Sequence, residues 1–191
     1  MTMEPPATTP SRLRVRLKIA TAAAHERVDL LAARFDLSDR NRYAQFLAAH
    51  AAAIVPLEQM LAEYGVANLL PDWALRSRSA ALLRDLDLLH AELRVIPVPI
   101  FASEAQMLGS LYVLEGSRFG ARFILRQVDP NAISGATHYL NHGAPDFWSG
   151  FLSVLENSPG AQENFNSVLD AALSTFDAFE RAFGADLELA A

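Results

Sequence analysis

Apolar residues recur at spacings of three and four along most of the chain, a period that is typical of amphipathic α-helices. The clearest stripe lies near the N-terminus and consists of Leu13, Leu17, Ala20, Ala24, Val28 and Leu31. Followed along the chain, the period predicts six helices, over residues 11–31, 39–64, 72–93, 104–128, 145–156 and 159–183. Residues 94–102 resemble a strand, but Pro97 and Pro99 favour an extended connector. We therefore expect an all-α fold, a single-domain helical bundle.

The predicted helix ends carry residues that favour caps and stops. N-caps are expected at Ser11, Ser38, Ser103 and Ser158. Gly65 and Gly184 are expected to end the second and the last helix, and Pro56 predicts a kink or a break within the second. A long loop is expected over residues 131–143.

The two ends of the chain set the predicted domain limits. Residues 1–10 are rich in Pro and Thr and predict a disordered lead-in, without the apolar stretch of a signal peptide. The helical domain is expected to cover residues 11–185, followed by a short tail at 186–191. A length of 191 residues fits one domain.

Composition removes several classes of function. Hydrophobic residues make up 51% of the chain, enough for a sizeable core, and the formal net charge is −6. Without a basic stripe, no nucleic-acid binding is expected, and no apolar run of about 20 residues predicts a membrane span. The absence of cysteine excludes disulfides, Cys-ligated zinc, iron–sulfur clusters and thiol nucleophiles. We expect a cytoplasmic location.

His25 is the histidine with the clearest chemical setting. It lies at the edge of the first apolar stripe, behind three alanines that leave one side of its ring uncovered. Asp29 follows one turn later, where its carboxylate can hold one ring nitrogen and leave the other for a metal. Lys18 precedes His25 by two turns on the same face. The alternative is a half-buried histidine that only pairs with a carboxylate.

The other four histidines give weaker signals. His50 and His90 lie among apolar residues and are expected in the core or at its boundary. His138 and His142 have a metal-binding spacing, but they fall in the predicted loop without a third ligand, so no metal site is expected there. No Glu-x-x-His pair supports a di-iron bundle.

Two glycines lie inside the fourth predicted helix. Gly116 and Gly120 bare the same face, with the Ser117 hydroxyl beside them. Each costs about 1 kcal/mol of helix stability relative to alanine, so the sequence predicts a reason for the bare face. Three explanations stay open: close packing against another helix, a kink, or a bendable wall over a planar ligand.

Two segments resemble motifs of the heme oxygenases. Residues 21–29, Thr-Ala-Ala-Ala-His-Glu-Arg-Val-Asp, are similar to the proximal-helix motif of this family. Residues 109–117, Gly-Ser-Leu-Tyr-Val-Leu-Glu-Gly-Ser, resemble the distal-helix motif of its bacterial, biliverdin-producing members, which are associated with phytochrome photoreceptors. A looser similarity includes Phe147, Trp148, Phe151, Leu152 and residues 176–183. In order along the chain, the resemblance covers residues 11–183.

The resemblance implies an enzyme that cleaves heme oxidatively to biliverdin and releases iron and CO, using O₂ and external electrons. Heme would be both substrate and cofactor. His25 would bind the heme iron as its proximal metal ligand, with Asp29 as the partner of its ring. The distal side of the heme would be formed by three residues: Gly116, Ser117 and Gly120. Two cations would pair with the heme propionates: Lys18 and Arg181.

The chain also departs from the family pattern. Bacterial members usually read Gly-Ser-Thr-Leu-Gly-Gly where this chain reads Gly-Ser-Arg-Phe-Gly-Ala, over residues 116–121. Ala121 is expected to stiffen the helix and to narrow the pocket by a methyl group. Arg118 is expected to point to solvent or to a propionate, and Phe119 is larger than its counterpart.

The resemblance implies partners as well. Electrons would come from a ferredoxin or a reductase, for which Arg12, Arg14 and Arg16 form a candidate docking patch. A bacteriophytochrome is a candidate acceptor of the biliverdin. Three other functions stay open: a non-catalytic heme carrier or sensor, an enzyme similar to the thiaminase-like proteins, and a structural bundle without a ligand. The second depends on a cysteine that this chain lacks.

Overall fold

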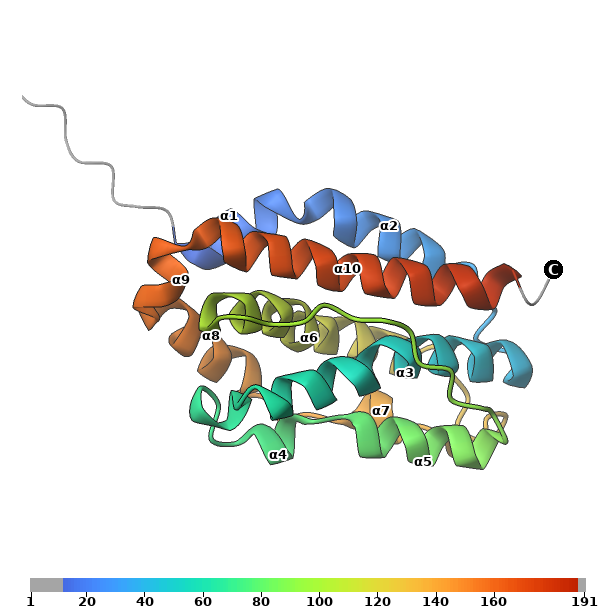
Figure 1. The fold of residues 1–191 in the computed structure, drawn as a ribbon. Helices are drawn as coiled ribbons and strands as arrows, with labels where there is room; N and C mark the ends of the chain where they lie inside the picture. The colour runs from blue at the N-terminus through green and yellow to red at the C-terminus, as the bar shows by residue number, and fades with distance from the viewer. Residues whose placement is uncertain (1–11, 189–191) are drawn as a thin grey trace, which may run out of the picture.

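The computed structural model describes residues 12–188, and every regular element in that range is helical (Figure 1). The elements are, in chain order, α1 (Leu13–Ala20), α2 (Ala22–Ala32), α3 (Arg40–Glu63), the 3-10 turn η1 (Val66–Asn68), α4 (Trp73–Arg76), α5 (Ser79–Leu89), α6 (Glu104–Leu125), α7 (His138–Asn141), α8 (Phe147–Asn157), α9 (Pro159–Glu163) and α10 (Phe165–Glu188). The predicted all-α fold is confirmed. Within the described range, no helix is long and apolar enough to cross a membrane. The predicted lead-in at 1–10 and the cap at Ser11 lie outside the described residues.

Three of the six predicted helices are interrupted. The first divides at Thr21, whose hydroxyl donates to the Leu17 carbonyl oxygen at 2.8 Å, a bond that bends helices. The third divides at residues 77–78 into α4 and α5, and the last divides at Asn164 into α9 and α10. In contrast, α3 continues through Pro56 as one helix.

Helix N-termini follow the predicted caps in two cases. The hydroxyls of Ser103 and Ser158 accept backbone N–H groups in the first turns of α6 and α9, as expected. The predicted cap at Ser38 is wrong. Asp39 caps α3 instead, because its carboxylate accepts two backbone N–H groups of the first turn.

The two predicted glycine stops behave differently. Gly65 has a φ of 81° and ends α3 in the left-handed conformation that a helix stop requires. Gly184 remains helical, and α10 continues to Glu188. The predicted helix end at 183 is therefore wrong, and residues 186–188 of the predicted tail belong to α10.

The predicted loop at 131–143 contains the short helix α7. Its N-terminus is held by Asp85 of α5, whose buried carboxylate accepts the backbone N–H groups of His138 and Tyr139 at 3.0 and 2.8 Å. A cap that comes from another helix leaves no local signal, so the sequence did not reveal α7. The connector at 94–102 has no regular structure, as predicted.

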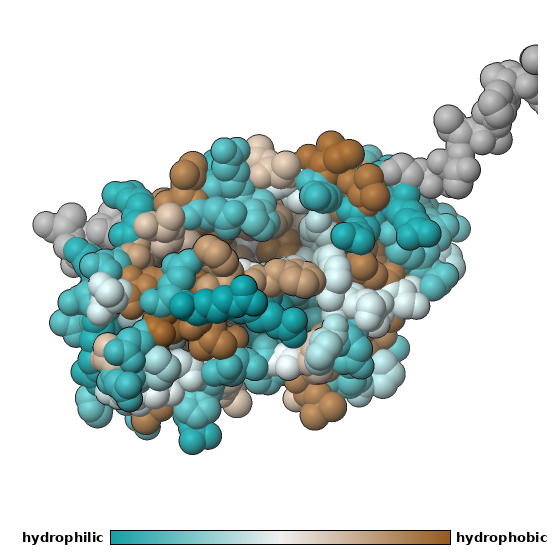
Figure 2. All heavy atoms as spheres, turned by 180° about the vertical axis from the view of Figure 1, so that it is seen from behind, coloured by the Kyte–Doolittle hydropathy of each residue, from teal (hydrophilic) through white to brown (hydrophobic). Residues whose placement is uncertain are grey.

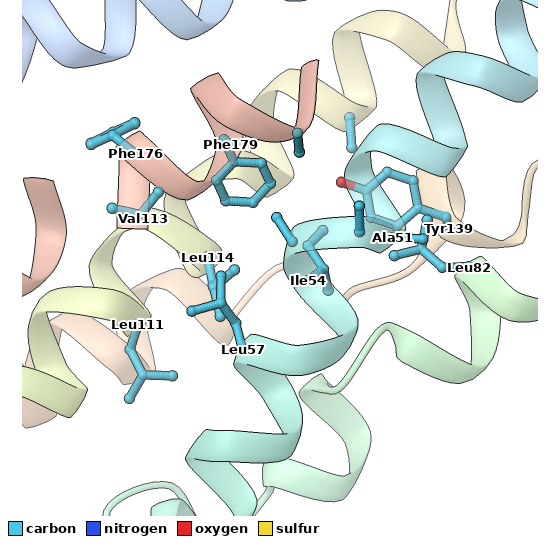
Figure 3. Packing of buried hydrophobic residues seen from close by; sticks show 14 of the residues in the cluster. Ala51, Ile54, Leu57, Leu82, Leu111, Val113, Leu114, Tyr139, Phe176 and Phe179 are labelled. Carbon is cyan, nitrogen blue, oxygen red and sulfur yellow. The ribbon is translucent and has the colours of Figure 1, made fainter. Parts of the chain in front are cut away.

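Helix α10 lies at the centre of the bundle and packs against α6, α3 and α2. In Figure 1 it runs between α1 and α2 on one side and α6 on the other. Gly109 permits the close approach of α6, since a Cβ there would lie 2.1 Å from the Val168 carbonyl oxygen of α10. Leu, Ile, Val and Phe side chains fill the space between α3, α6 and α10 (Figure 3).

Candidate functional site

His25 lies on the exposed side of α2 with Asp29 as its partner. The ring Nδ1 is 2.9 Å from the Asp29 Oδ2, and the two side chains are 61% and 66% exposed. One helical turn therefore brings the two residues together as the spacing predicts, but the ring is exposed and not half-buried. Because Nδ1 is engaged, Nε2 is the nitrogen available to a metal.

The ring of His25 also contacts α10. It meets the Phe176 ring edge-on, with the ring centroids 5.8 Å apart. Phe176 shares the buried cluster with Val113 of α6, and both are labelled in Figure 3. Val113 lies three residues before Gly116, on the same side of α6. Phe176 is thus a buried link between the His25 helix and the predicted distal helix.

One face of α6 is apolar and uncovered. It consists of Gly116, Phe119, Gly120 and Phe123, which share one side of the helix because the last three follow Gly116 by three, four and seven residues. Phe119 is 54% exposed and Phe123 is 64% exposed. A Cβ at Gly120 would meet no atom of the described residues within 4 Å. We call these four residues the open face of α6.

Close helix packing does not explain the two glycines. A Cβ at Gly116 would lie 3.9 Å from the Trp148 ring, an ordinary contact distance, and the space at Gly120 is open. Close packing explains Gly109 instead, which the sequence analysis did not single out. Close packing is therefore excluded as the reason for these two glycines, and the open space at Gly120 favours the wall over a ligand.

The side of the molecule opposite to the view in Figure 1 is hollowed near its middle (Figure 2). The hollow lies below the upper edge of the molecule, which α1 and α2 form in Figure 1. Hydrophobic side chains lie within it and at its rim. We call this hollow the cleft; α10 packs against both α2, which carries His25, and α6, which carries the open face.

Ser117 is held by Arg78, an arginine for which the sequence gave no prediction. Arg78, only 1% exposed, donates from Nη1 to the Ser117 Oγ and from Nη2 to the Leu114 carbonyl oxygen, both at 3.0 Å. The Ser117 hydroxyl in turn donates to the Leu114 carbonyl oxygen at 2.8 Å. These bonds fix the orientation of the hydroxyl beside the open face. No motif marks Arg78, which lies within a predicted helix.

Arg118 is buried, which corrects the expectation that it points to solvent or to a propionate. Its Nη2 donates to the Glu115 carboxylate and to the Arg76 carbonyl oxygen, each at 2.7 Å. Arg76 donates to the other Glu115 oxygen at 2.9 Å. Burial lowers the pKa of Arg118, and the Glu115 carboxylate opposes that shift. One buried carboxylate thus joins two guanidinium groups and ties α6 to α4.

The other two departures from the family pattern also lie at defined places. Ala121 is 7% exposed and belongs to the buried cluster, so its methyl packs into the core and does not narrow the open face. Phe119 meets the Trp148 ring edge-on at 5.7 Å between centroids.

The predicted propionate partners are not placed alike. Lys18 is exposed in the last turn of α1, on the N-terminal side of the Thr21 bend that leads to His25. Arg181 donates to the Asp177 carboxylate and to the Pro97 carbonyl oxygen, both at 3.0 Å. Its guanidinium therefore points to the connector.

Tyr112 of α6 lies near α1, beside Thr21 and Arg14. Burial raises the pKa of its phenol, whereas Thr21 and Arg14 lower that pKa. It lies one turn before Gly116, and its residue type gave no signal in the sequence.

In the predicted docking patch, the guanidinium of Arg16 lies 3.6 Å from the centre of the Phe165 ring.

The remaining histidines differ from one another. The ring of His50 packs among aromatic residues, and burial lowers its pKa to about 4. His90 is exposed in the left-handed C-cap of α5, which corrects its predicted place in the core. His138 and His142 lie on and directly after α7, and the His138 ring pairs with Asp85 at 2.6 Å. Among the described residues, no three His, Asp or Glu side chains form a metal-binding group.

Comparison with known proteins gives relatives of one kind. The chain is 31% identical to "Heme oxygenase PigA" of Pseudomonas aeruginosa strain PAO1, over 98% of this chain and 97% of that protein. It is 34% identical to a protein named heme oxygenase from Xanthomonas campestris pv. campestris (strain 8004), over 62% of this chain and 74% of that one. No family model matches the chain.

A solved structure shares the fold. The heme oxygenase of Neisseria meningitidis, described with NO and CO bound, superposes with a TM-score of 0.76 at 21% identity. The match covers 93% of this chain and 92% of that one.

Proposed function

Because this chain belongs to the heme oxygenase family, we propose that it binds heme and cleaves it oxidatively to biliverdin, releasing iron and CO. The reaction would consume O₂ and electrons from an external donor. The observation that carries the proposal is the pair formed by an exposed, carboxylate-held histidine on α2 and an uncovered apolar face on α6. Both features are exposed at the surface of the described residues, and both suit a flat iron-containing ring.

The residues of the cleft fit heme in their chemistry. His25 offers Nε2 as an axial ligand, while Asp29 keeps the proton on Nδ1 and so fixes the tautomer. The bare backbone at Gly116 and Gly120 lets a flat ring lie close to α6 and excludes water from that side. When bound, heme would supply the iron at which O₂ is activated.

Polar groups at the edges would orient the ring and handle protons. Ser117 would hold water beside the open face, in an orientation that Arg78 sets. Lys18 would pair with one propionate, since it is exposed in the last turn of α1, directly before the helix that carries His25. The role of Arg181 stays a prediction, because to bind a propionate its guanidinium would have to leave Asp177 and Pro97.

Several partners also stay predictions. The donor, a ferredoxin or a reductase, would dock near α1, where Arg12 and Arg14 are exposed beside Arg16. A bacteriophytochrome as acceptor of biliverdin and a cytoplasmic location rest on the resemblance and the composition described above.

A heme carrier or sensor is the second candidate. Phe119 favours it, because this exposed ring on the open face could cover the heme side where oxygen must enter. Ala121 gives a carrier no support, because its buried methyl does not narrow the open face.

The test is a hemin titration of the wild type, His25→Ala and a control, His90→Asn, followed by ascorbate under air with catalase present. We expect a Soret band in the wild type and the control, a weaker or shifted band in His25→Ala, and its recovery with imidazole. Ascorbate should then convert the Soret band to the broad red band of biliverdin. A Soret band that persists under ascorbate would favour the carrier, and a wild type that does not bind hemin would refute both functions.

A further inference from the structure

The open face of α6 is closed at one end by Trp148 of α8. The indole lies 3.9 Å from the place where a Cβ of Gly116 would be, and its centroid is 5.7 Å from the Phe119 ring. Tyr112, one turn before Gly116, contributes a third ring at 5.9 Å. Further along the open face, a Cβ at Gly120 would meet no atom of the described residues within 4 Å. A flat ligand on this face therefore meets Trp148 at the Gly116 end.

Helix α8 is held firmly against the elements that border the cleft. The Glu156 carboxylate of α8 accepts the backbone N–H groups of Leu13 and Arg14 at 3.0 and 2.9 Å and thereby caps α1. At the other end of α8, Arg76 donates to the Phe147 carbonyl oxygen at 2.8 Å. Because Arg76 of α4 also donates to the Glu115 carboxylate of α6, these bonds hold Trp148 in place relative to both α1 and α6.

The indole itself has little freedom to move away. Phe151 lies behind it, with the ring centroids 5.7 Å apart, and Phe119 meets it at an interplanar angle of 86°. The residue is half-buried, so one part packs in this aromatic group and the rest remains accessible. A large, rigid side chain in this setting acts as a stop and not as a flexible cover.

We propose that Trp148 is a specificity-determining residue: its indole limits the in-plane position of the heme on the open face and so selects which meso carbon is cleaved. This inference rests on the proposed function. His25 fixes the axis about which the ring rotates, and Lys18 attracts a propionate from the side of α1. Trp148 then excludes those rotations that push a propionate or a vinyl group past Gly116 toward Tyr112.

The experiment compares the wild type with Trp148→Ala and Trp148→Phe, and it uses Trp73→Phe in α4 as the control tryptophan. Two readouts are taken. The first is the ratio of biliverdin isomers, separated by chromatography after turnover with ascorbate. The second needs no turnover: the pattern of heme methyl resonances in the proton NMR spectrum of the ferric, cyanide-treated hemin complex reports the rotation of the ring.

We expect Trp148→Ala to retain hemin binding but to change the isomer ratio by at least about fivefold, with a second set of methyl resonances. That change equals about 1 kcal/mol, the scale of one aromatic contact. Trp148→Phe and Trp73→Phe should keep the wild-type pattern. If Trp148→Ala does not fold, Trp148→Leu replaces it, because it keeps apolar volume but removes the flat ring.

The outcomes separate this inference from the proposed function. An unchanged isomer ratio and an unchanged methyl pattern in a folded Trp148→Ala or Trp148→Leu overturn the role of Trp148 and leave the activity intact. A shifted methyl pattern supports the inference even where turnover is slow. A wild type that binds no hemin overturns the proposed function, and the inference falls with it.

Discussion

The same substitution, glycine to alanine, should have opposite effects at two positions of α6. In Gly120→Ala the new methyl enters open space, so the gain in helix propensity of about 1 kcal/mol is retained. In Gly109→Ala the methyl would lie 2.1 Å from the Val168 carbonyl oxygen. This oxygen belongs to the backbone of α10, which cannot rotate away as a side chain can. Overpacking costs about 1–3 kcal/mol, and this backbone clash belongs at the upper end.

The resulting shifts can be measured as melting temperatures of the ligand-free protein. For a chain of this size, about 1 kcal/mol corresponds to about 2–4 °C. Gly120→Ala should raise the Tm by that amount, and Gly109→Ala, with a net loss of about 2 kcal/mol, should lower it by about 4–8 °C. Hemin titration gives the second half of the prediction: Gly120→Ala should bind hemin more weakly than the wild type.

Thermal unfolding followed by circular dichroism decides between these expectations. Shifts of equal sign and size in the two variants would refute the assignment of Gly109 to packing and of Gly120 to the open face. A Gly120→Ala variant that is more stable than the wild type but binds hemin with the same affinity would show that hemin does not lie against the open face.

Three further predictions concern charge. Glu115→Ala leaves two buried guanidinium groups without their shared carboxylate and should lower the free energy of unfolding by about 3–5 kcal/mol, measured by urea titration. Burial lowers the pKa of His50 from 6.5 to about 4, so between these pH values the unfolded chain binds one proton more than the folded chain, and the free energy of unfolding falls as the pH falls from 6.5 to 4. His50→Phe should reduce this loss by up to about 3 kcal/mol. An equal loss in both proteins would exclude His50 as its source. Lys18→Ala should weaken hemin binding about two- to fivefold at low salt, while Arg84→Ala on α5 should not, and equal affinities in all three proteins would remove Lys18 from the site.

Local signals in the sequence predicted what one helix decides by itself. The fold class follows from the apolar period, and the caps at Ser103 and Ser158 follow from short side-chain bonds within one turn. The contact of His25 with Asp29 also follows from a spacing of four residues on one helix. In each case the partner is near in the sequence, so the pattern contains the whole interaction.

Signals that depend on a second element were missed or misread. Arg118 was expected to point to solvent or to a propionate, but its guanidinium is buried because it donates to the Glu115 carboxylate and to the Arg76 carbonyl oxygen of α4. Arg78 is unremarkable in sequence and gains its position from Ser117, 39 residues later. Helix α7 depends on Asp85, more than 50 residues before it. Such partners become visible only when the chain is folded.

The most direct test of the heme oxygenase assignment is the amount of CO released for each hemin consumed. Purified protein is loaded with one equivalent of hemin and supplied with ascorbate and catalase under air in a sealed vial, and the CO in the headspace is measured by gas chromatography. We expect one CO, one iron and one biliverdin for each hemin, and none of the three above background in His25→Ala. Loss of the Soret band without CO would refute the heme oxygenase assignment, because it would show that heme is destroyed by another reaction.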